Sequence, residues 1–387
     1  MNDYLRYGFR LLIFIITNLY AFPTYMVWMT LLTPLRLLAP KTYWWMEAHM
    51  FKMLECMVIT WCDSGGYKVI ECGDDIGLLH DKEAIVLSNH QSTGDTPILF
   101  LASYLKGLAC GTTMWIMWIL FKFTNFGLVS VHREDFFIDQ GKETRQLQLE
   151  NLKKHLKESY LPHDRKWIIV FPEGGFLYKR LESSQRYARA NGYPVLQHVT
   201  LPRVGAVKVI LDTIGEPYDP VSSSTTEEGG PVLSPEAANV TSDHQLADDQ
   251  LPLKWIIDIT IAYKNGKPLD FLGMCIGYNP QEDVLLHYKA YRAKDIPRDE
   301  EALTSWLYDR YCEKDALLDY YYKHGELSEE VLSSRRILPH LRTSYIRFDV
   351  LQQILIHLFF IMSCYVHYSF LLKPFLGLCS SVLSFVF

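Results

Sequence analysis

The residues best suited to chemistry are a histidine and an aspartate that follow an expected strand. The strand covers residues 84–88 (Ala-Ile-Val-Leu-Ser), and His90 and Asp95 come directly after it. A carboxylate beside an imidazole fixes the tautomer of the ring and stabilises its protonated form, which leaves the second ring nitrogen to accept a proton. The pair therefore predicts a general base, His90, and a residue that orients it, Asp95.

The spacing of this pair is not specific on its own. A second pair with the same spacing, His244 and Asp249, lies in an acidic stretch with no expected strand before it. A short motif of this kind needs further support from the rest of the chain before a function can be inferred from it.

Three further motifs provide that support, because they follow the first pair in a fixed order. The first motif ends in an arginine, the second follows another expected strand, and the third is a proline block: Gly127-Leu-Val-Ser-Val-His-Arg133, Phe171-Pro-Glu173-Gly174-Gly175 and Val199-Thr-Leu-Pro202-Arg203. With His90 and Asp95, these motifs resemble the glycerophospholipid acyltransferase family, which has His-x4-Asp, an arginine motif, Phe-Pro-Glu-Gly and a proline block in this order. Gly175 departs from the Ser or Thr that many members carry there, and Leu201 from their Val or Ile.

The resemblance implies a function and a role for each motif. Acyl-CoA would be the co-substrate and a lysophospholipid the acceptor, either lysophosphatidylglycerol or lysophosphatidylethanolamine, in phospholipid remodelling. The implied catalytic residues are His90 and Asp95, Arg133 would bind the acceptor's phosphodiester, and the other substrate-binding residues would be Glu173, Gly174, Gly175, Pro202 and Arg203. No bound cofactor or metal is expected. The backbone amides after His90 are candidates for stabilising the oxyanion.

Several alternatives stay open. Arg133 and Glu173 could form a buried ion pair with each other instead of binding substrate. A basic group on the expected helix after Glu173 fits either the phosphates of CoA or a solvated helix face: Lys179, Arg180, Arg186 and Arg189. The chain could also be a non-catalytic, membrane-anchored lipid-binding adaptor, or a CoA-independent transacylase. A serine hydrolase elbow, a His-Glu-x-x-His metal motif and a Walker loop are absent from the sequence.

The elements that position these motifs read as an α/β domain. Short apolar, β-branched runs predict buried strands at residues 84–87, 128–131, 167–171 and 255–261. Residues 140–160 have the spacing of an amphipathic helix, and helical segments separate several of the strands. This alternation predicts a mixed, mostly parallel sheet covered by helices, with the chemistry at the strand ends.

Both ends of the chain read as membrane segments. Residues 11–32 contain no charge and are long enough to cross a bilayer, and residues 350–372 are largely apolar. Residues 43–61 predict either an amphipathic helix at the membrane interface or a packed core helix. Four arginines precede the C-terminal segment, Arg335, Arg336, Arg342 and Arg347, and Lys373 alone follows it. This bias predicts that the domain between the two segments faces the cytosol. The family resemblance implies that the membrane is that of the endoplasmic reticulum.

Composition divides the chain further. Its 38 basic and 44 acidic residues give a net charge of -6, which argues against nucleic acid as a partner. The expected partners are the phospholipid membrane, acyl-CoA and the lysophospholipid acceptor. Residues 215–250 contain eight carboxylates and no Lys or Arg, which predicts a disordered acidic insertion. The scattered cysteines predict reduced thiols. The expected domains are a membrane anchor with its interfacial helix (1–66), an acyltransferase domain (67–324), and a basic flank with a membrane segment (325–387).

Overall fold

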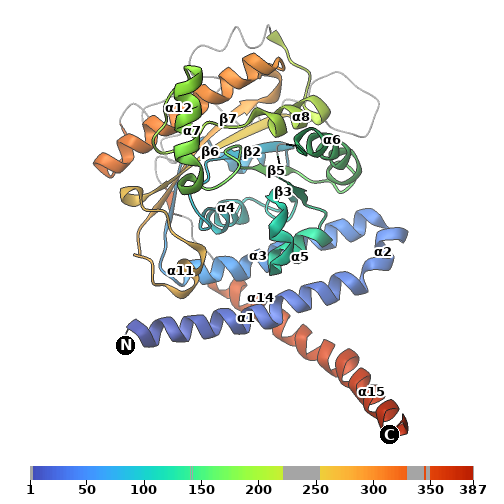
Figure 1. Ribbon diagram of the computed structural model, residues 1–387. Helices are drawn as coiled ribbons and strands as arrows, with labels where there is room; N and C mark the ends of the chain where they lie inside the picture. Colours follow the sequence, from blue (N-terminus) through green and yellow to red (C-terminus); the bar gives the residue numbers. More distant parts are fainter. Residues whose placement is uncertain are drawn as a thin grey trace.

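A mixed sheet forms the centre of the molecule. The computed structural model describes residues 3–139, 141, 143–220, 253–328, 344–345 and 349–386. Within these residues, eight strands lie in the order β4-β3-β5-β2-β6-β7-β1-β8 (Figure 1). Their bounds are β1 Val69–Gly73, β2 Ala84–Ser88, β3 Thr113–Trp118, β4 Phe136–Ile138, β5 Trp167–Val170, β6 Trp255–Tyr263, β7 Val284–Arg292 and β8 Ser344–Tyr345.

Five neighbouring strands run in one direction and share a carboxyl edge. In the series β4, β3, β5, β2 and β6, each strand is parallel to the next. Strand β7 is antiparallel to β6, β1 is parallel to β7, and β8 is antiparallel to β1. The predicted mixed, mostly parallel sheet is therefore confirmed. Residues that follow β2, β5 and β6 lie at the same edge.

Helices cover both faces of this sheet (Figure 1). Strand β2 shows why: Ala84 and Val86 pack into the core shared with α3 and α4, whereas Ile85 and Leu87 pack into the core shared with α6, α8 and α12. A strand with apolar residues on both faces requires two covering layers. The helices are α1 Asp3–Leu31, α2 Thr33–Leu38, α3 Pro40–Asp63, α4 Asp95–Tyr104, α5 Asn125–His132, α6 Arg145–His155, α7 Leu177–Asn191, α8 Val204–Ile214, α11 Phe271–Ile276, α12 Glu300–His324, α14 Val350–His367 and α15 Lys373–Val386.

The predicted strand at residues 128–131 is wrong, because this stretch belongs to helix α5. Thr124 caps the helix by accepting a hydrogen bond from the Gly127 backbone N–H at 3.0 Å. Leu128 and Val131, three positions apart, are both exposed, and Val129 is buried. The β-branched residues suggested a strand, but the cap and the helical spacing of exposed residues decide the local structure.

Helix α3 packs against the folded domain. For residues 43–61 the sequence left open two alternatives, a packed core helix and an amphipathic helix at the membrane interface. It contacts α1 on one side and α4 on the other. Two acidic residues on it, Glu47 and Glu55, have no exposed surface. The burial of both carboxylates supports the packed helix, and a position at the membrane interface stays a prediction.

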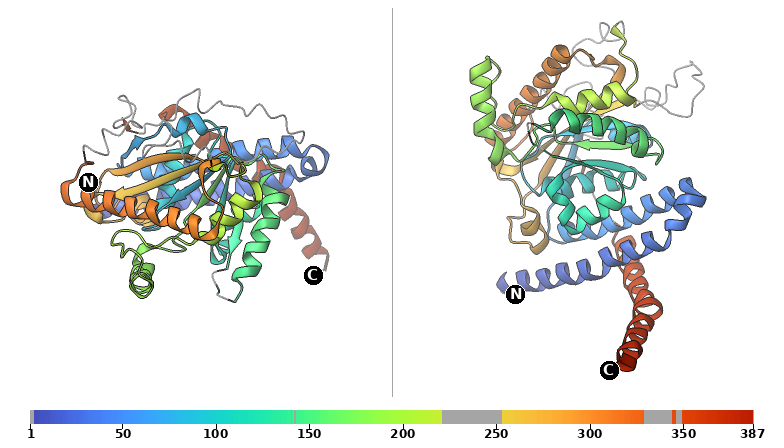
Figure 2. Two further views of the ribbon diagram at one scale, coloured as in Figure 1. Left: turned by 90° about the horizontal axis from the view of Figure 1, so that it is seen from above. Right: turned by 45° about the vertical axis from the view of Figure 1, so that its right-hand side comes forward.

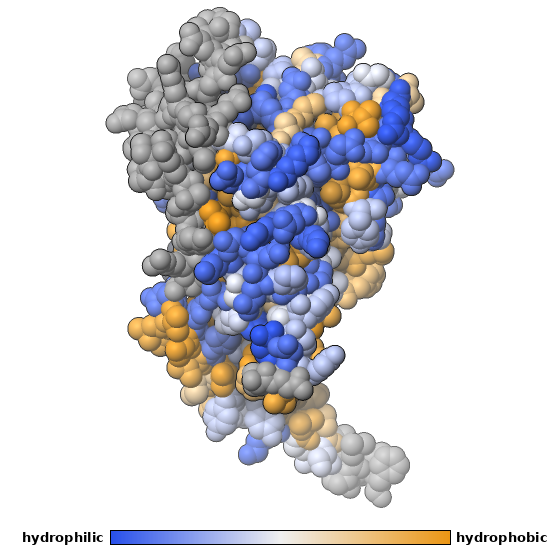
Figure 3. All heavy atoms as spheres, turned by 90° about the vertical axis from the view of Figure 1, so that its left-hand side faces the viewer, coloured by the Kyte–Doolittle hydropathy of each residue, from blue (hydrophilic) through white to orange (hydrophobic). Residues whose placement is uncertain are grey.

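Among the described residues, two helices are long and apolar enough to cross a membrane: α1, and the stretch Val350–Ser381 that contains α14. They contact each other, and the Tyr20 hydroxyl lies 2.7 Å from His357 Nδ1 across that contact. Two views show that α14 crosses α1 and that α15 then leads away from the domain (Figures 1 and 2). In a third view, hydrophobic residues gather near the lower end of the molecule and hydrophilic residues cover most of the upper part (Figure 3).

Some sequence predictions fall outside the described residues. Only 215–220 of the acidic insertion are described, and His244, Asp249 and most of the basic flank are not. The helix expected over 140–160 is represented by α6, which begins at Arg145 and continues as a π-helical turn, Leu156–Tyr160. The eight cysteines are unpaired.

Candidate active site

His90 and Asp95 form the contact that their spacing predicts. His90 Nδ1 donates to Asp95 Oδ2 at 2.9 Å. The side chain of His90 is 14% exposed and that of Asp95 is fully buried. Asn89 fixes the start of this loop, because its side chain forms two hydrogen bonds with the backbone of Ile261 on β6. With Nδ1–H committed to the carboxylate, His90 Nε2 is the nitrogen that can accept a proton.

The carboxylate of Asp95 is held by three more donors. Its Oδ2 accepts the backbone N–H groups of Gln91 at 2.6 Å and Ser92 at 2.9 Å. Its Oδ1 accepts the hydroxyl of Tyr263 at 2.5 Å. Because the Gln91 and Ser92 amides bind Asp95, they are not available to an oxyanion. A role for the other amides at the start of α4 stays a prediction.

Tyr263 is a site residue that the sequence did not reveal. It is the last residue of β6, and its side chain is buried against Asp95. Burial and the neighbouring Asp95 charge raise the pKa of Tyr263 well above its ordinary value, so the hydroxyl keeps its proton and remains a donor. Only the parallel pairing of β2 with β6 brings together two residues 168 positions apart.

Glu173 holds the backbone of His90. Its Oε1 accepts the His90 backbone N–H at 2.8 Å, and its Oε2 accepts the N–H and the hydroxyl of Thr200 at 3.0 and 2.8 Å. The carbonyl of His90 accepts the backbone N–H of Leu177 at 2.8 Å. Burial raises the pKa of Glu173 to about 8. Both carboxyl oxygens are engaged by the protein, and the substrate-binding role of Glu173 stays a prediction.

Two aromatic rings lie against the imidazole. The ring of Phe171 stacks on His90 with a centroid separation of 3.9 Å, and that of Phe176 lies at 4.4 Å. These contacts limit the orientations of the His90 ring and add an apolar surface beside it. The Phe-Pro-Glu-Gly motif therefore acts on His90 through a backbone contact and through ring packing.

The glycines of this motif allow two arginines to approach. Gly174 and Gly175 have φ angles of +68° and +154°, and a Cβ on either would contact the guanidinium of Arg203 at 3.1 Å or Arg180 Nε at 3.0 Å. Arg180 also donates to the carbonyl of Gly174 at 3.0 Å, and the Arg203 backbone N–H donates to Pro172. Pro202 is buried directly before Arg203.

These arginines form a positive region next to the loop that holds His90. Although Arg203 remains exposed, partial burial lowers the pKa of its guanidinium, and the neighbouring charges of Arg180 and Arg145 lower it further. An anion beside a group of guanidinium ions offsets their mutual repulsion, so such a group favours binding of an anion. Phosphate groups have the geometry that such arginines bind.

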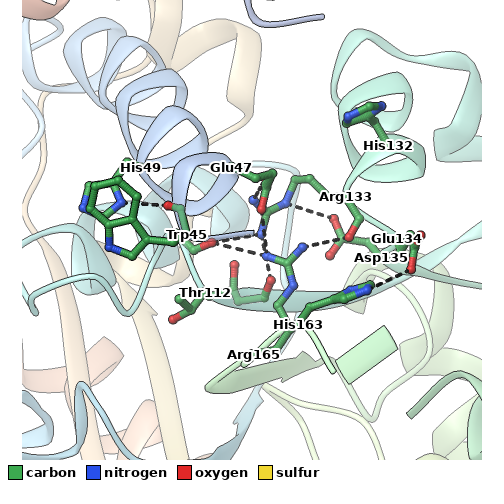
Figure 4. A network of polar contacts seen from close by, with 12 residues as sticks. Trp45, Glu47, His49, Thr112, His132, Arg133, Glu134, Asp135, His163 and Arg165 are labelled. Atoms are coloured by element: carbon green, nitrogen blue, oxygen red, sulfur yellow. Dashed lines mark hydrogen bonds and ion pairs between the residues drawn. The ribbon is translucent and has the colours of Figure 1, made fainter. Parts of the chain in front are cut away.

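Arg133 lies away from this region. Its side chain is fully buried, its Nη1 binds Glu47 Oε1 at 2.5 Å, and its Nη2 donates to the Thr113 carbonyl at 2.8 Å (Figure 4). Arg165 joins the same network through Glu47 Oε2 at 3.2 Å and the Arg133 carbonyl at 2.8 Å. Thr113 begins β3 and Arg165 precedes β5, so this cluster lies at the amino edge of the sheet.

The position of Arg133 has a topological reason. Strands β3 and β4 are parallel, so helix α5 must return the chain from the carboxyl edge to the amino edge, and Arg133 follows the end of α5. His90 and Glu173 lie at the other edge. The alternative of an Arg133–Glu173 ion pair is therefore wrong, and contact between Arg133 and the acceptor phosphate finds no support in this geometry.

The arrangement at the carboxyl edge defines a class of protein. A histidine oriented by a buried aspartate, next to a positive region, fits an enzyme that activates a hydroxyl beside an anionic group. Among the described residues, no cluster of three or more His, Cys, Asp or Glu could hold a metal ion.

Comparison with known proteins gives the family. Residues 70–219 match the family described as Acyltransferase, and residues 277–346 match the Acyltransferase C-terminus. The chain is 41% identical over 316 residues to acyl-CoA:lysophosphatidylglycerol acyltransferase 1 of Homo sapiens, which covers 82% of this chain and 81% of that protein. The chain belongs to the glycerophospholipid acyltransferase family, as the motifs predicted.

Two further relatives are more distant. The 1-acyl-sn-glycerol-3-phosphate acyltransferase epsilon of Mus musculus is 23% identical over 331 residues, covering 82% of this chain and 79% of that protein. A solved structure, the 1-acyl-sn-glycerophosphate (LPA) acyltransferase PlsC from Thermotoga maritima, is similar at 13% identity with a TM-score of 0.35. That match covers 78% of this chain and 97% of the other.

Proposed function

We propose that this chain transfers a fatty acyl group from acyl-CoA to the free hydroxyl of a lysophospholipid, in phospholipid remodelling. The observation that carries the proposal is the hydrogen bond from His90 Nδ1 to the fully buried Asp95, with part of the His90 side chain still exposed. Family membership supports the reaction class. Similarity to the human acyl-CoA:lysophosphatidylglycerol acyltransferase 1 supports lysophosphatidylglycerol as the acceptor, and lysophosphatidylethanolamine is the second candidate.

The reaction needs no covalent intermediate on the enzyme. His90 Nε2 takes the proton of the lysophospholipid hydroxyl while the hydroxyl oxygen attacks the thioester carbon. The tetrahedral intermediate collapses, the C–S bond breaks, and CoA leaves as the thiolate. The proton held by His90 passes to that thiolate or to water, which returns the imidazole to its neutral form. Asp95 stabilises the imidazolium between these two steps.

The substrates carry phosphates that the positive region can recognise. Arg203 and Arg180 lie beside Gly174 and Gly175, in the loop that holds His90 through Glu173. We assign them to a substrate phosphate, either the phosphodiester of the acceptor or a phosphate of CoA. Arg203→Ala should raise the KM for one of the two substrates and leave that for the other nearly unchanged. An unchanged KM for both would remove Arg203 from the binding site.

The proposed reaction is tested with the purified full-length protein, labelled acyl-CoA and a panel of lysophospholipids. We expect a labelled diacyl phospholipid to form with the preferred acceptor. His324→Ala, at the exposed end of α12, is the control for His90→Ala and should keep full activity. Absence of transfer to every acceptor would favour the non-catalytic adaptor. Transfer from a phospholipid donor without CoA would favour the transacylase.

The membrane location is part of the same proposal. The two apolar helices support membrane association. We propose the endoplasmic reticulum membrane, with the catalytic domain in the cytosol. The sequence Asn239-Val240-Thr241 gives a direct test, because a cytosolic domain does not meet the glycosylation machinery. We expect Asn239 to carry no glycan in the native protein. A glycan at Asn239 would show that the domain faces the lumen instead of the cytosol.

A further inference from the structure

An exposed apolar segment lies at the carboxyl end of β3, outside the catalytic residues. Residues 118–132 contain one cation, Lys122, and no carboxylate. Six large apolar side chains on this segment are between 40% and 86% exposed, and we call them the apolar ridge: Trp118, Leu120, Phe121, Phe123, Leu128 and Val131. Apolar side chains of this size each favour removal from water by roughly 1.5–3 kcal/mol, so a ridge of six indicates a partner surface.

The ridge is joined to helix α1. Phe126 packs edge-on against Phe22 with ring centroids 4.8 Å apart, and the Asn125 side chain donates to Asn18 Oδ1 at 3.1 Å. On α1, the outward side chains are again apolar and exposed: Leu12, Ile15, Ile16 and Leu19. Figure 1 shows α5 next to α1. The ridge therefore continues the apolar surface of α1, one of the two helices among the described residues that are long and apolar enough to enter a membrane.

Helix α1 also reaches the loop that follows His90. Its Phe14 packs against Phe271 with ring centroids 6.1 Å apart. The backbone N–H of Phe271 donates to the Thr93 hydroxyl at 3.0 Å, three residues after His90. Between Phe14 and Phe22, α1 thus runs from the His90 loop to the helix that follows β3. The shared apolar surface lies along the edge of the sheet that carries His90.

We propose that the apolar ridge inserts into the lipid bilayer beside α1, so that a lipid acceptor reaches His90 from the membrane without crossing water. A bilayer is the occupant that these observations favour, because the ridge continues a membrane helix and carries a single cation. The ridge therefore binds through apolar insertion and does not require anionic lipid. Trp118 and Lys122 have the amphipathic character that suits the boundary between lipid and water.

Insertion is measured with a fluorophore attached at position 123, in Phe123→Cys, in full-length protein reconstituted into phosphatidylcholine vesicles. The matched control is Leu147→Cys, because Leu147 is also exposed but lies on α6, which covers the opposite face of the sheet. The unsubstituted protein corrects for labelling of native cysteines. Quenchers on the lipid chains should quench the label at 123 and not that at 147. Equal quenching at both positions, or quenching at 123 by aqueous reagents alone, would overturn the proposal.

A second arm measures transfer to vesicle-embedded lysophospholipid and to a short-chain acceptor dissolved as a monomer. Phe123→Glu combined with Leu128→Glu should lower the first rate at least about tenfold and leave the second near wild type, because charge opposes insertion. Leu147→Glu should lower neither. A variant that keeps both rates would overturn the proposal, and a variant that keeps both rates but loses self-association would make the ridge a contact between two copies. This arm rests on the proposed function. The quenching arm does not, because it measures insertion of the ridge into the bilayer even if the wild type shows no acyl transfer.

Discussion

At the level of single residues, Asp95 accepts more hydrogen bonds than the one from His90 that orients the imidazole. The carboxylate accepts four hydrogen bonds, and the Tyr263 hydroxyl is the only side-chain donor among them besides His90. Tyr263 binds Asp95 Oδ1, whereas His90 binds Oδ2, so we treat Tyr263 as a positioning residue that acts through Asp95.

Tyr263→Phe tests that role. Loss of the hydroxyl frees Asp95 Oδ1 and loosens the orientation of His90, so we expect kcat to fall about tenfold with KM for both substrates nearly unchanged. Steady-state kinetics on vesicle-embedded lysophospholipid measures the split. Tyr320→Phe, on the exposed side of α12, should be neutral. A rise in KM at constant kcat would instead make Tyr263 a substrate-binding residue.

Glu173→Gln tests the backbone contact of His90. Each Glu173 oxygen accepts a hydrogen bond, and an amide would turn one of these sites into a donor that faces an N–H group. We expect at least about a hundredfold loss of kcat, since a small displacement of His90 is costly to catalysis. A circular dichroism spectrum like that of the wild type would exclude misfolding, and Glu182→Gln on α7 provides the control. Full activity in Glu173→Gln would show that the contact does not position His90.

At the scale of elements, the two edges of the sheet have different tasks. The amino edge holds the buried network of Glu47, Arg133 and Arg165, which connects α3 to the loops before β4 and β5 (Figure 4). The carboxyl edge holds His90 and the positive region. Residues at the first edge should therefore affect stability, and those at the second should affect turnover and binding.

Glu47→Gln examines this division. It leaves two buried guanidinium groups without their shared carboxylate, so the free energy of unfolding should fall by about 3–5 kcal/mol. Thermal unfolding in detergent measures the loss. Arg203→Ala should leave the melting temperature within a degree or two of the wild type, because its side chain is exposed. Equal melting temperatures for Glu47→Gln and the wild type would contradict a structural role for the network.

Glu55 on α3 makes stability depend on pH. Burial raises its pKa to about 8, and neither carboxyl oxygen accepts a nitrogen or oxygen donor among the described residues. Because the native pKa lies above the unfolded one, its stabilising contribution is complete below pH 4.5 and is lost as pH rises through 8. Glu55→Gln should therefore gain up to about 4 kcal/mol relative to the wild type between pH 5 and pH 8.5.

Urea unfolding at the two pH values measures this difference, with Glu150→Gln on the exposed face of α6 as the control. The control should keep the pH dependence of the wild type. If Glu55→Gln also keeps it, Glu55 does not hold a proton in the native state.

The sequence predicted local features better than long-range ones. The strands at 84, 167 and 255 were recognisable because buried strands are apolar on both faces, and His90 could be linked to Asp95 because both lie in one loop. The stretch 128–131 was misread, since β-branched residues outweighed the Thr124 cap. The location of Arg133 and the contact with Tyr263 depend on which strands are neighbours, and no local pattern in the sequence contains that information.

At the scale of the whole molecule, the apolar helices and the catalytic edge belong to one arrangement. Helix α1 packs against α3, α5 and α11, and α14 packs against α1 and α3. In the proposed reaction, a water-soluble thioester and a lipid acceptor meet at one histidine, and the proposed ridge places the catalytic edge at the boundary between the two phases. The contacts of α1 with the His90 loop and with α5 support this proposal.

The measurement that tests the central claim most directly is the single-turnover rate of acyl transfer from labelled acyl-CoA to lysophosphatidylglycerol by the wild type, His90→Ala and Asp95→Asn. General-base catalysis by an oriented imidazole predicts a loss of about a hundredfold or more for His90→Ala. A large loss is also expected for Asp95→Asn, because the amide favours the wrong tautomer. Transfer by His90→Ala at the rate of the wild type would contradict the account.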